Sequence, residues 1–264
     1  QIQGVGHGVE LCRGDSVRPS ITTVIPTLGM APLLGLCVEH LRAALRSDGG
    51  NPGDRIVVID NATPDALSRD DFPGDDIVWI RFDAHHSFSS CCNSGMNRAP
   101  NPLYLMLNND VVLHRDAVSV MADCLVRHPS VGIVGSRLVF PSGHIQHGGI
   151  RFGNTDFLLY HEHRTVPTNS VPRATAHYQA VTGACMMIRA EVIKATGGFD
   201  EIYPFYFEDI DLCLRAREAG WHIMCCHEVD SIHFESMTAG PKEMNPEAKA
   251  IFLKRWEGRW TIDG

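Results

Sequence analysis

Residues 207–221 read FEDIDLCLRAREAGW, which predicts a helix whose first turn carries two adjacent carboxylates, Glu208 and Asp209, and which ends at a glycine. Acidic residues favour the positive end of a helix dipole, so capping alone explains one part of this pattern. Three aromatic residues come just before the pair, and aromatic walls that exclude water suit a carboxylate that takes a proton from a bound hydroxyl. We therefore interpret Asp209 as a candidate general base. Asp211 is expected to face away from it and to tolerate substitution.

Apolar strands and helical patterns alternate along the first half of the chain. Strands with little polar content are typical of a sheet buried on both faces, so the sequence predicts an α/β fold with a mostly parallel, Rossmann-like central sheet flanked by helices. We expect a leader or linker over residues 1–19 and one domain over 20–264. Segment 144–176 has no regular pattern, and we expect it to form a smaller subregion of loops and edge strands that shapes the choice of acceptor. The predicted early strands are 21–26, 55–59, 77–82 and 103–107.

Two further acidic residues follow strands of this predicted sheet. Asp60 ends an apolar strand, where it is placed to accept a hydrogen bond from a nucleoside base or ribose, and a simple capped turn explains it equally well. Asp110 follows Asn108 and Asn109 at the end of the predicted strand 103–107. Carboxylate and amide oxygens are the hard ligands that Mg²⁺ or Mn²⁺ takes together with substrate phosphates. Asp110 and Asp209 together indicate transfer chemistry on a phosphorylated donor.

Composition narrows the class of protein. The formal net charge of −8 argues against nucleic-acid binding, which needs a basic surface. No apolar run approaches the roughly 20 residues of a membrane span, and no secretory signal is present. The nine cysteines include no CxxC spacing, which predicts a reduced, cytoplasmic protein with structural thiols. The histidines at 161 and 163 lack the spacing of a helical zinc motif, so we expect surface or loop histidines there and at His147. The chain starts at Gln1, so it is interpreted as one domain of a larger polypeptide or a trimmed chain.

In this order, the segments resemble family 2 glycosyltransferases, inverting enzymes with a GT-A fold that use nucleotide sugars. The resemblance covers residues 20–256. Two positions depart from the family pattern: 85–87 read HHS, where the family has an Asn and, before Phe88, a Gly, and Asn108 stands where many members have a first Asp, which leaves the metal open between Mg²⁺ and Mn²⁺. The matching segments are 22–27 TTVIPT, 57–65 VVIDNATPD, 88–97 FSSCCNSGMN, 107–110 LNND, 183–189 GACMMIR, 197–201 GGFDE and 207–215 FEDIDLCLR.

The resemblance implies a role for each matching residue. Asp209 would be the base with Glu208 supporting it, and Asp110 would hold the metal on the diphosphate, with His233 as a metal or diphosphate contact. The donor would be a UDP- or dTDP-sugar and the acceptor a glycan or lipid-linked glycan of a bacterial surface polysaccharide, handled in the cytoplasm or at the inner face of the plasma membrane. Contacts to the nucleotide sugar would come from Pro26, Asp60, Asn93, Asn109 and Asp110.

Two other functions remain open at this point. A catalytically silent module that binds nucleotide sugars or carbohydrates within a larger protein would keep the same residues. A sugar-phosphate nucleotidyltransferase would need a glycine-rich phosphate loop after the first strand, where this chain has 26–30 PTLGM. The predicted terminal helix, 246–260, mixes cations with aromatic residues, which suits either a peripheral membrane contact or packing on the domain, with packing the more favoured.

Overall fold

The computed structural model describes residues 18–64, 67–153, 159–235 and 245–264, so the predicted leader lies almost wholly outside the described residues. The first half is built as predicted. Strands β1 (Ile21–Thr27), β2 (Arg55–Asp60), β3 (Ile77–Arg81) and β4 (Leu103–Leu107) are parallel, in the order β4-β1-β2-β3. Helix α1 (Ala31–Arg46) joins β1 to β2, and helix α2 (Phe88–Arg98) joins β3 to β4. The sequence prediction of a parallel Rossmann-like half is confirmed.

The second half of the sheet is mixed rather than parallel. Strand β11 (Cys185–Arg189) lies between β4 and β6 (Val131–Val139) and is antiparallel to both. Strand β12 (His222–His233) then pairs in parallel with β6, and β10 (Ala176–Tyr178) closes that edge antiparallel to β12. The expectation of a mostly parallel sheet holds for the first half and for the β6–β12 pair, whereas β10 and β11 run antiparallel to their neighbours. The second half includes strands joined without helical crossovers, which permits antiparallel pairing.

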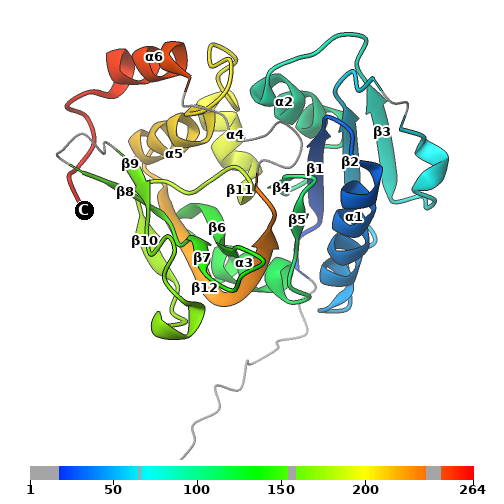
Figure 1. The fold of residues 1–264 in the computed structure, drawn as a ribbon, viewed down its shortest axis with the longest axis horizontal. Helices are drawn as coiled ribbons and strands as arrows, with labels where there is room; N and C mark the ends of the chain where they lie inside the picture. The colour runs from blue at the N-terminus through cyan, green and yellow to red at the C-terminus, as the bar shows by residue number, and fades with distance from the viewer. Residues whose placement is uncertain (1–17, 65–66, 154–158, 236–244) are drawn as a thin grey trace, which may run out of the picture.

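Short strands surround the end of this second half (Figure 1). Strand β5 (Val111–Val112) pairs with the end of β12, and β7 (Ile145–His147) pairs with β6. Strands β8 (Ile150–Phe152) and β9 (Leu159–His161) form a separate two-stranded sheet. The described residues of segment 144–176 thus form loops, short edge strands and a single 3-10 turn (Thr168–Ser170), in keeping with the sequence prediction.

Helices cover both faces of the sheet (Figure 1). The core on one face includes apolar side chains of α1 and of α3 (Ala117–Arg127), and the core on the other includes those of α2, α4 (Ala190–Thr196) and α5 (Glu208–Glu218). The eight cysteines among the described residues are buried free thiols, in keeping with a structural role. In α2, Gly95 allows close packing, because a Cβ there would lie 2.4 Å from Val24.

The last helix, α6 (Pro246–Trp256), packs on the domain. Phe252 and Trp256 are fully buried, and Phe252 stacks on Phe207, so the aromatic side chains that a membrane contact would use lie in the core. Lys249 and Lys254 stay exposed. The packing interpretation of this helix is therefore the one that the structure supports. Among the described residues, no helix is long and apolar enough to cross a membrane.

Candidate active site

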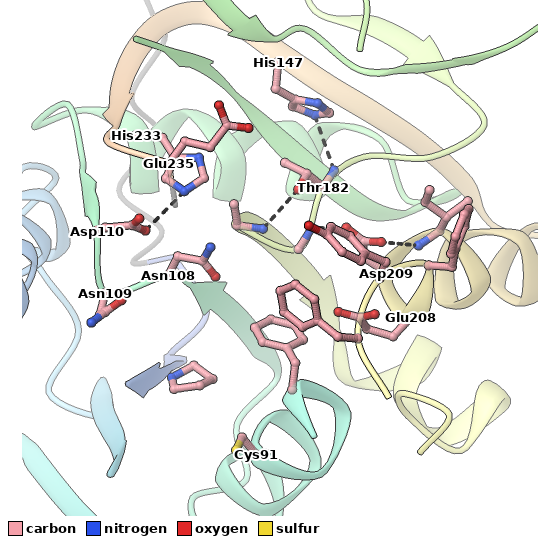
Figure 2. Close-up of a pocket in the computed structure, with 18 of the residues that line it drawn as sticks. Cys91, Asn108, Asn109, Asp110, His147, Thr182, Glu208, Asp209, His233 and Glu235 are labelled. Atoms are coloured by element: carbon pink, nitrogen blue, oxygen red, sulfur yellow. Dashed lines mark hydrogen bonds and ion pairs between the residues drawn. The ribbon is translucent and has the colours of Figure 1, made fainter. Parts of the chain in front are cut away.

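A cavity of about 590 Å³ opens where the ends of β1, β4 and β12 meet the start of α5. It brings together residues that are far apart in sequence, and Figure 2 shows Asp110 and His233 on one side of it and Glu208 and Asp209 on another. Six of the residues proposed from sequence line it: Pro26, Asn109, Asp110, Glu208, Asp209 and His233.

Asp110 and His233 are neighbours because β12 is a long strand. It continues to His233, whose backbone pairs with Val111 of β5, directly after Asp110. His233 Nε2 lies 3.1 Å from Asp110 Oδ1, and both residues are buried. On its other side, His233 Nδ1 is 2.6 Å from Gln146 Oε1. Since an amide oxygen accepts, Nδ1 carries a hydrogen, and Nε2 is the ring atom that faces the carboxylate of Asp110.

Two electron-pair donors that face each other suit a shared cation. Divalent cations take one or two protein ligands and complete their shell with phosphate oxygens, and a metal-binding histidine usually donates its other N–H to a carbonyl. Asp110, His233 and Gln146 fit that arrangement. No group of three or more His, Cys, Asp or Glu side chains with metal-binding geometry occurs in the described part of the chain, so substrate oxygens would have to supply the remaining ligands.

Asn109 braces the cavity from the side of β1. Its amide Nδ2 donates to Thr27 Oγ1 at 2.8 Å and to the carbonyl of Gly29 at 3.2 Å. These bonds tie the end of β4 to the loop after β1, which also brings Pro26 to the cavity wall. The amide of Asn109 is therefore engaged in holding two strand ends together.

Glu208 and Asp209 are presented by a strained turn. Tyr206 and Phe207, just before them, both have left-handed backbone angles, with φ of 74° and 69°. Such angles are unfavourable for bulky residues and are found mainly where the surrounding structure fixes a functional geometry. Asp209 Oδ2 accepts from the backbone N–H of Gly183 at 2.8 Å, and Oδ1 accepts from that of Ile210 at 2.8 Å. A Cβ at Gly183 would lie 3.3 Å from that of Asp209, so glycine allows this close approach.

Burial shapes the electrostatics of this carboxylate pair. It raises the pKa of Glu208 to about 8, with the charge of Asp209 as the second cause. Burial also raises the pKa of Asp209, but four hydrogen bonds, from the backbone of Gly183, Ile210 and Asp209 itself and from the side chain of Thr182, oppose that rise. Glu208 Oε2 is buried with no hydrogen-bond partner. Hydrogen bonds to Asp209 and the lack of one at Glu208 Oε2 therefore favour the proton of the pair on Glu208 and the charge on Asp209.

A pH-dependent stability follows from Glu208. Its pKa is raised on folding, so the folded state binds more protons than the unfolded state between the ordinary glutamate pKa and about 8. The stabilisation by this proton is complete below the ordinary pKa and is lost as pH rises through about 8. We expect Glu208→Gln to remove this loss, so that the melting temperature falls less between pH 6 and pH 9 than in the wild type. Equal slopes for the two proteins, measured by thermal melts across that range, would show that Glu208 is not buried with its proton.

Three residues singled out from sequence lie elsewhere than expected. Asp60 does not line the cavity: it is fully buried, accepts from the Thr63 backbone N–H at 3.0 Å and pairs with Arg81, which fits the capped-turn alternative. Asn93 also lies outside the cavity lining and ties α2 to the loop at Phe199 through two backbone hydrogen bonds. Asp211 faces away from Asp209 as expected, but it is fully buried, so we expect its substitution to cost stability.

Other residues of the cavity wall escaped the sequence interpretation. Asn61 lines the cavity and clamps the backbone of His86 with two hydrogen bonds of 2.9 Å. His147, expected at the surface, is 1% exposed and lies in the wall beside His161. These two histidines end different short strands 14 residues apart, so no local spacing signals their contact.

Comparisons with known proteins agree with this geometry. Residues 19–257 match the family model described as glycosyltransferase like family 2. The chain belongs to this glycosyltransferase family. Among solved structures, it resembles GalNAc-T7 with UDP, GalNAc and Mn²⁺, with a TM-score of 0.71, 13% identity and coverage of 90% of this chain and 49% of that one. A mannosyltransferase from Pyrobaculum calidifontis in complex with GDP-Man and Mn²⁺ gives a TM-score of 0.59 at 18% identity, covering 91% of this chain and 61% of that one. The predicted GT-A fold is confirmed.

Curated relatives of this family 2 chain come from several microbes. It is 30% identical over 248 residues to an uncharacterised protein of Sinorhizobium fredii and 27% identical over 227 residues to an O-antigen biosynthesis protein of Myxococcus xanthus. These matches cover 89% and 83% of this chain but only 26% and 17% of the relatives, so the chain spans about a quarter or less of their length. An N-acetylglucosaminyl-diphospho-decaprenol L-rhamnosyltransferase of Mycobacterium tuberculosis is 26% identical over 189 residues, or 61% of this chain and 60% of that protein.

Proposed function

We propose that this domain is an inverting glycosyltransferase that moves a sugar from a UDP- or dTDP-sugar to a hydroxyl of a glycan or lipid-linked glycan. The observation that carries the proposal is the shared cavity: Asp209, fixed by the N–H of Gly183, faces the same space as the Asp110–His233 pair. The names of the Myxococcus and Mycobacterium relatives support synthesis of a bacterial surface polysaccharide. A reaction on the cytoplasmic side is part of the proposal. The whole protein would then be a longer polypeptide with this domain as one part.

The chain's own residues would divide the reaction between them. Asp110 and His233 would hold Mg²⁺ or Mn²⁺, which when bound supplies positive charge against the diphosphate leaving group. Asp209 would take the proton of the acceptor hydroxyl as that oxygen forms its bond to the anomeric carbon. The aromatic turn before Glu208 would exclude water, which limits hydrolysis of the donor. A single displacement of this kind inverts the anomeric centre.

A thermal-shift experiment tests the metal role. We expect UDP with MnCl₂ to raise the melting temperature of the wild type, and Asp110→Asn to lose most of that rise. At a ligand concentration about 100 times the dissociation constant, the stabilisation is about 2.7 kcal/mol, or roughly 5 to 10 °C for a domain of this size. Asp123→Asn, which changes an exposed carboxylate of α3, is the matched control and should respond like the wild type. An undiminished shift with Asp110→Asn, or one insensitive to EDTA, would remove the metal from the proposal.

A turnover assay distinguishes the glycosyltransferase from a binding module without catalysis. Release of UDP or dTDP from the nucleotide sugar that stabilises the protein most would be measured with and without a glycan acceptor. A glycosyltransferase releases nucleotide under these conditions, whereas a silent module shows the thermal shift and no release. Asp110 and Asp209 both line the cavity, which favours the enzyme over the silent module.

A further inference from the structure

A pair of histidines forms part of the cavity wall. His147 ends β7 and His161 ends β9, and both line the cavity. Their Nδ1 atoms lie 2.7 Å apart, and the two rings meet edge to face with centroids 4.9 Å apart. One hydrogen must therefore lie between two nitrogens of the same kind, and the rest of the structure determines which ring carries it.

The backbone of Thr182 decides this question. Its N–H lies 3.4 Å from His147 Nε2, as the dashed line in Figure 2 shows, and an amide N–H can only donate. His147 Nε2 is thus an acceptor without hydrogen, and a neutral His147 carries its hydrogen on Nδ1. Nδ1 then donates to His161 Nδ1, so a neutral His161 carries its own hydrogen on Nε2. Burial keeps both rings neutral, because it lowers the pKa of His161 to about 4 and that of His147 well below its ordinary value.

The chain of hydrogen bonds ends in a donor that no described residue uses. Among the described residues, none has a hydrogen bond to His161 Nε2, and His161 is partly exposed on the cavity wall. The chain also starts at the turn that holds the base, since Gly183, whose N–H binds Asp209, directly follows Thr182. The donor at His161 and the carboxylate of Asp209 are therefore fixed by one stretch of backbone.

The neighbouring wall indicates what this donor binds. Arg164 and Glu235 line the same cavity and form an ion pair of 3.0 Å, so their charges compensate each other. Leu159 and Tyr160, next to His161, add apolar surface to the lining. A wall with a neutral donor, a compensated ion pair and an aromatic ring suits a neutral ligand with hydroxyl groups and an apolar face, rather than a phosphate.

We propose that His161 is an acceptor-binding residue, whose Nε2–H donates to a hydroxyl of the acceptor sugar other than the one that attacks, and that His147 fixes the tautomer that makes this possible. This inference rests on the proposed glycosyl transfer and names the side of the cavity that binds the acceptor. His147 acts through His161 and is a positioning residue.

Two conservative variants of His161 separate binding from structure. The amide nitrogen of Gln reaches the place of Nε2, so His161→Gln keeps the distal donor and loses the partner of His147. The amide of Asn reaches the place of Nδ1, so His161→Asn keeps a partner for His147 and loses the distal donor. A neutral hydrogen bond contributes about 0.5–1.5 kcal/mol, so we expect His161→Asn to raise the acceptor KM up to about tenfold and His161→Gln to stay near the wild type. The donor KM should change in neither.

The kinetic test uses octyl glycosides of N-acetylglucosamine, galactose and rhamnose as acceptors, with the nucleotide sugar that stabilises the protein most. A near-normal acceptor KM in His161→Asn together with a raised one in His161→Gln would assign His161 a purely structural role. Donor hydrolysis without transfer to any glycoside would overturn the proposal that the acceptor is a sugar. Nitrogen NMR of the histidine rings tests the tautomer directly: hydrogen on Nδ1 of His161 would overturn the inference.

The same spectra keep the two proposals distinct. A protein that neither hydrolyses nor transfers from any nucleotide sugar fails as a glycosyltransferase. The inference about His161 is then decided by its tautomer and by its Nε2 signal on addition of the octyl glycosides, which should move if that atom binds a sugar hydroxyl. An unmoved signal counts against the sugar-binding role.

Discussion

Asp209→Asn should reduce turnover by about 10² to 10⁴ while the nucleotide sugar still binds. A sugar hydroxyl is a poor nucleophile at neutral pH, so a carboxylate within hydrogen-bond reach must take its proton as the new bond forms. The N–H groups of Gly183 and Ile210 hold the Asp209 carboxylate in one orientation. Asn has the size of Asp but cannot take the proton, so the variant loses the base. Its Oδ1 can still accept from one of the two N–H groups while its NH2 faces the other, so a thermal melt without ligand must show that the variant is folded. Steady-state kinetics give the loss of kcat, and thermal shift with the donor shows whether binding survives.

The pH dependence of turnover is a second test of the role of Asp209. Asp209 must be charged to act as a base, and burial raises its pKa above the ordinary aspartate value. Turnover should therefore fall as pH decreases through that raised pKa, at a higher pH than for an exposed aspartate. Asp116→Asn, a carboxylate half exposed before α3, is the control and should leave kcat unchanged. Near-normal turnover of Asp209→Asn, or a product that retains the donor's anomeric configuration, would defeat the assignment.

The Glu208→Gln variant distinguishes the roles of the two adjacent carboxylates. Because its pKa is raised to about 8, Glu208 already carries its proton at neutral pH, and Glu208→Gln should cost far less turnover than Asp209→Asn. The sequence indicates that both acids belong to one site, but two adjacent letters carry no information on which is charged. That distinction comes from burial and from the N–H groups of Gly183 and Ile210, which the fold brings to Asp209.

The parallel half of the fold is readable from sequence for a physical reason. Each strand there is apolar throughout, and each is followed by a helical pattern, so local periodicity and global topology agree. The same reasoning located Asp110 at a strand end and Asp209 at a helix start. Residues whose role depends on a distant partner could not be found this way. His147 and His161 meet because β7 and β9 converge on one wall, and Asn61 reaches His86 across 25 positions.

Asp60 and His233 also have partners that their own segments of sequence do not reveal. Asp60 has the position expected of a nucleoside contact, but Arg81 at the end of the neighbouring strand pairs with its carboxylate, and the register that brings them together is not visible in either segment. His233 had no support from its own neighbours in sequence. The length of β12 is what carries it to Asp110.

Asp211 shows why the direction of a side chain does not predict its tolerance to substitution. Asp211 lies two positions after Asp209 on α5, so its side chain points away from the cavity. Helix α6 packs on that side, and Asp211 therefore faces the core. Its Oδ1 accepts from Arg255 Nη1 and Trp256 Nε1, both at 2.8 Å, and from the hydroxyl of Tyr203 at 3.1 Å. Oδ2 accepts from Arg215 Nε at 2.6 Å. The Asp211 carboxylate therefore joins α5, α6 and the segment at Tyr203.

Asp211→Asn should be the most destabilising of these substitutions. It removes the charge that Arg215 and Arg255 pair with, and an amide nitrogen placed against their N–H groups repels them. Removing one partner of a buried ion pair costs about 3 to 5 kcal/mol, which for a domain of this size lowers the melting temperature by roughly 6 to 20 °C. Asp123→Asn is again the exposed control and should change it little. At a temperature where the variant stays folded, kcat should remain near that of the wild type, because Asp211 does not face the cavity. A melting temperature within 2 °C of the wild type would mean that this carboxylate does not hold α6 to α5.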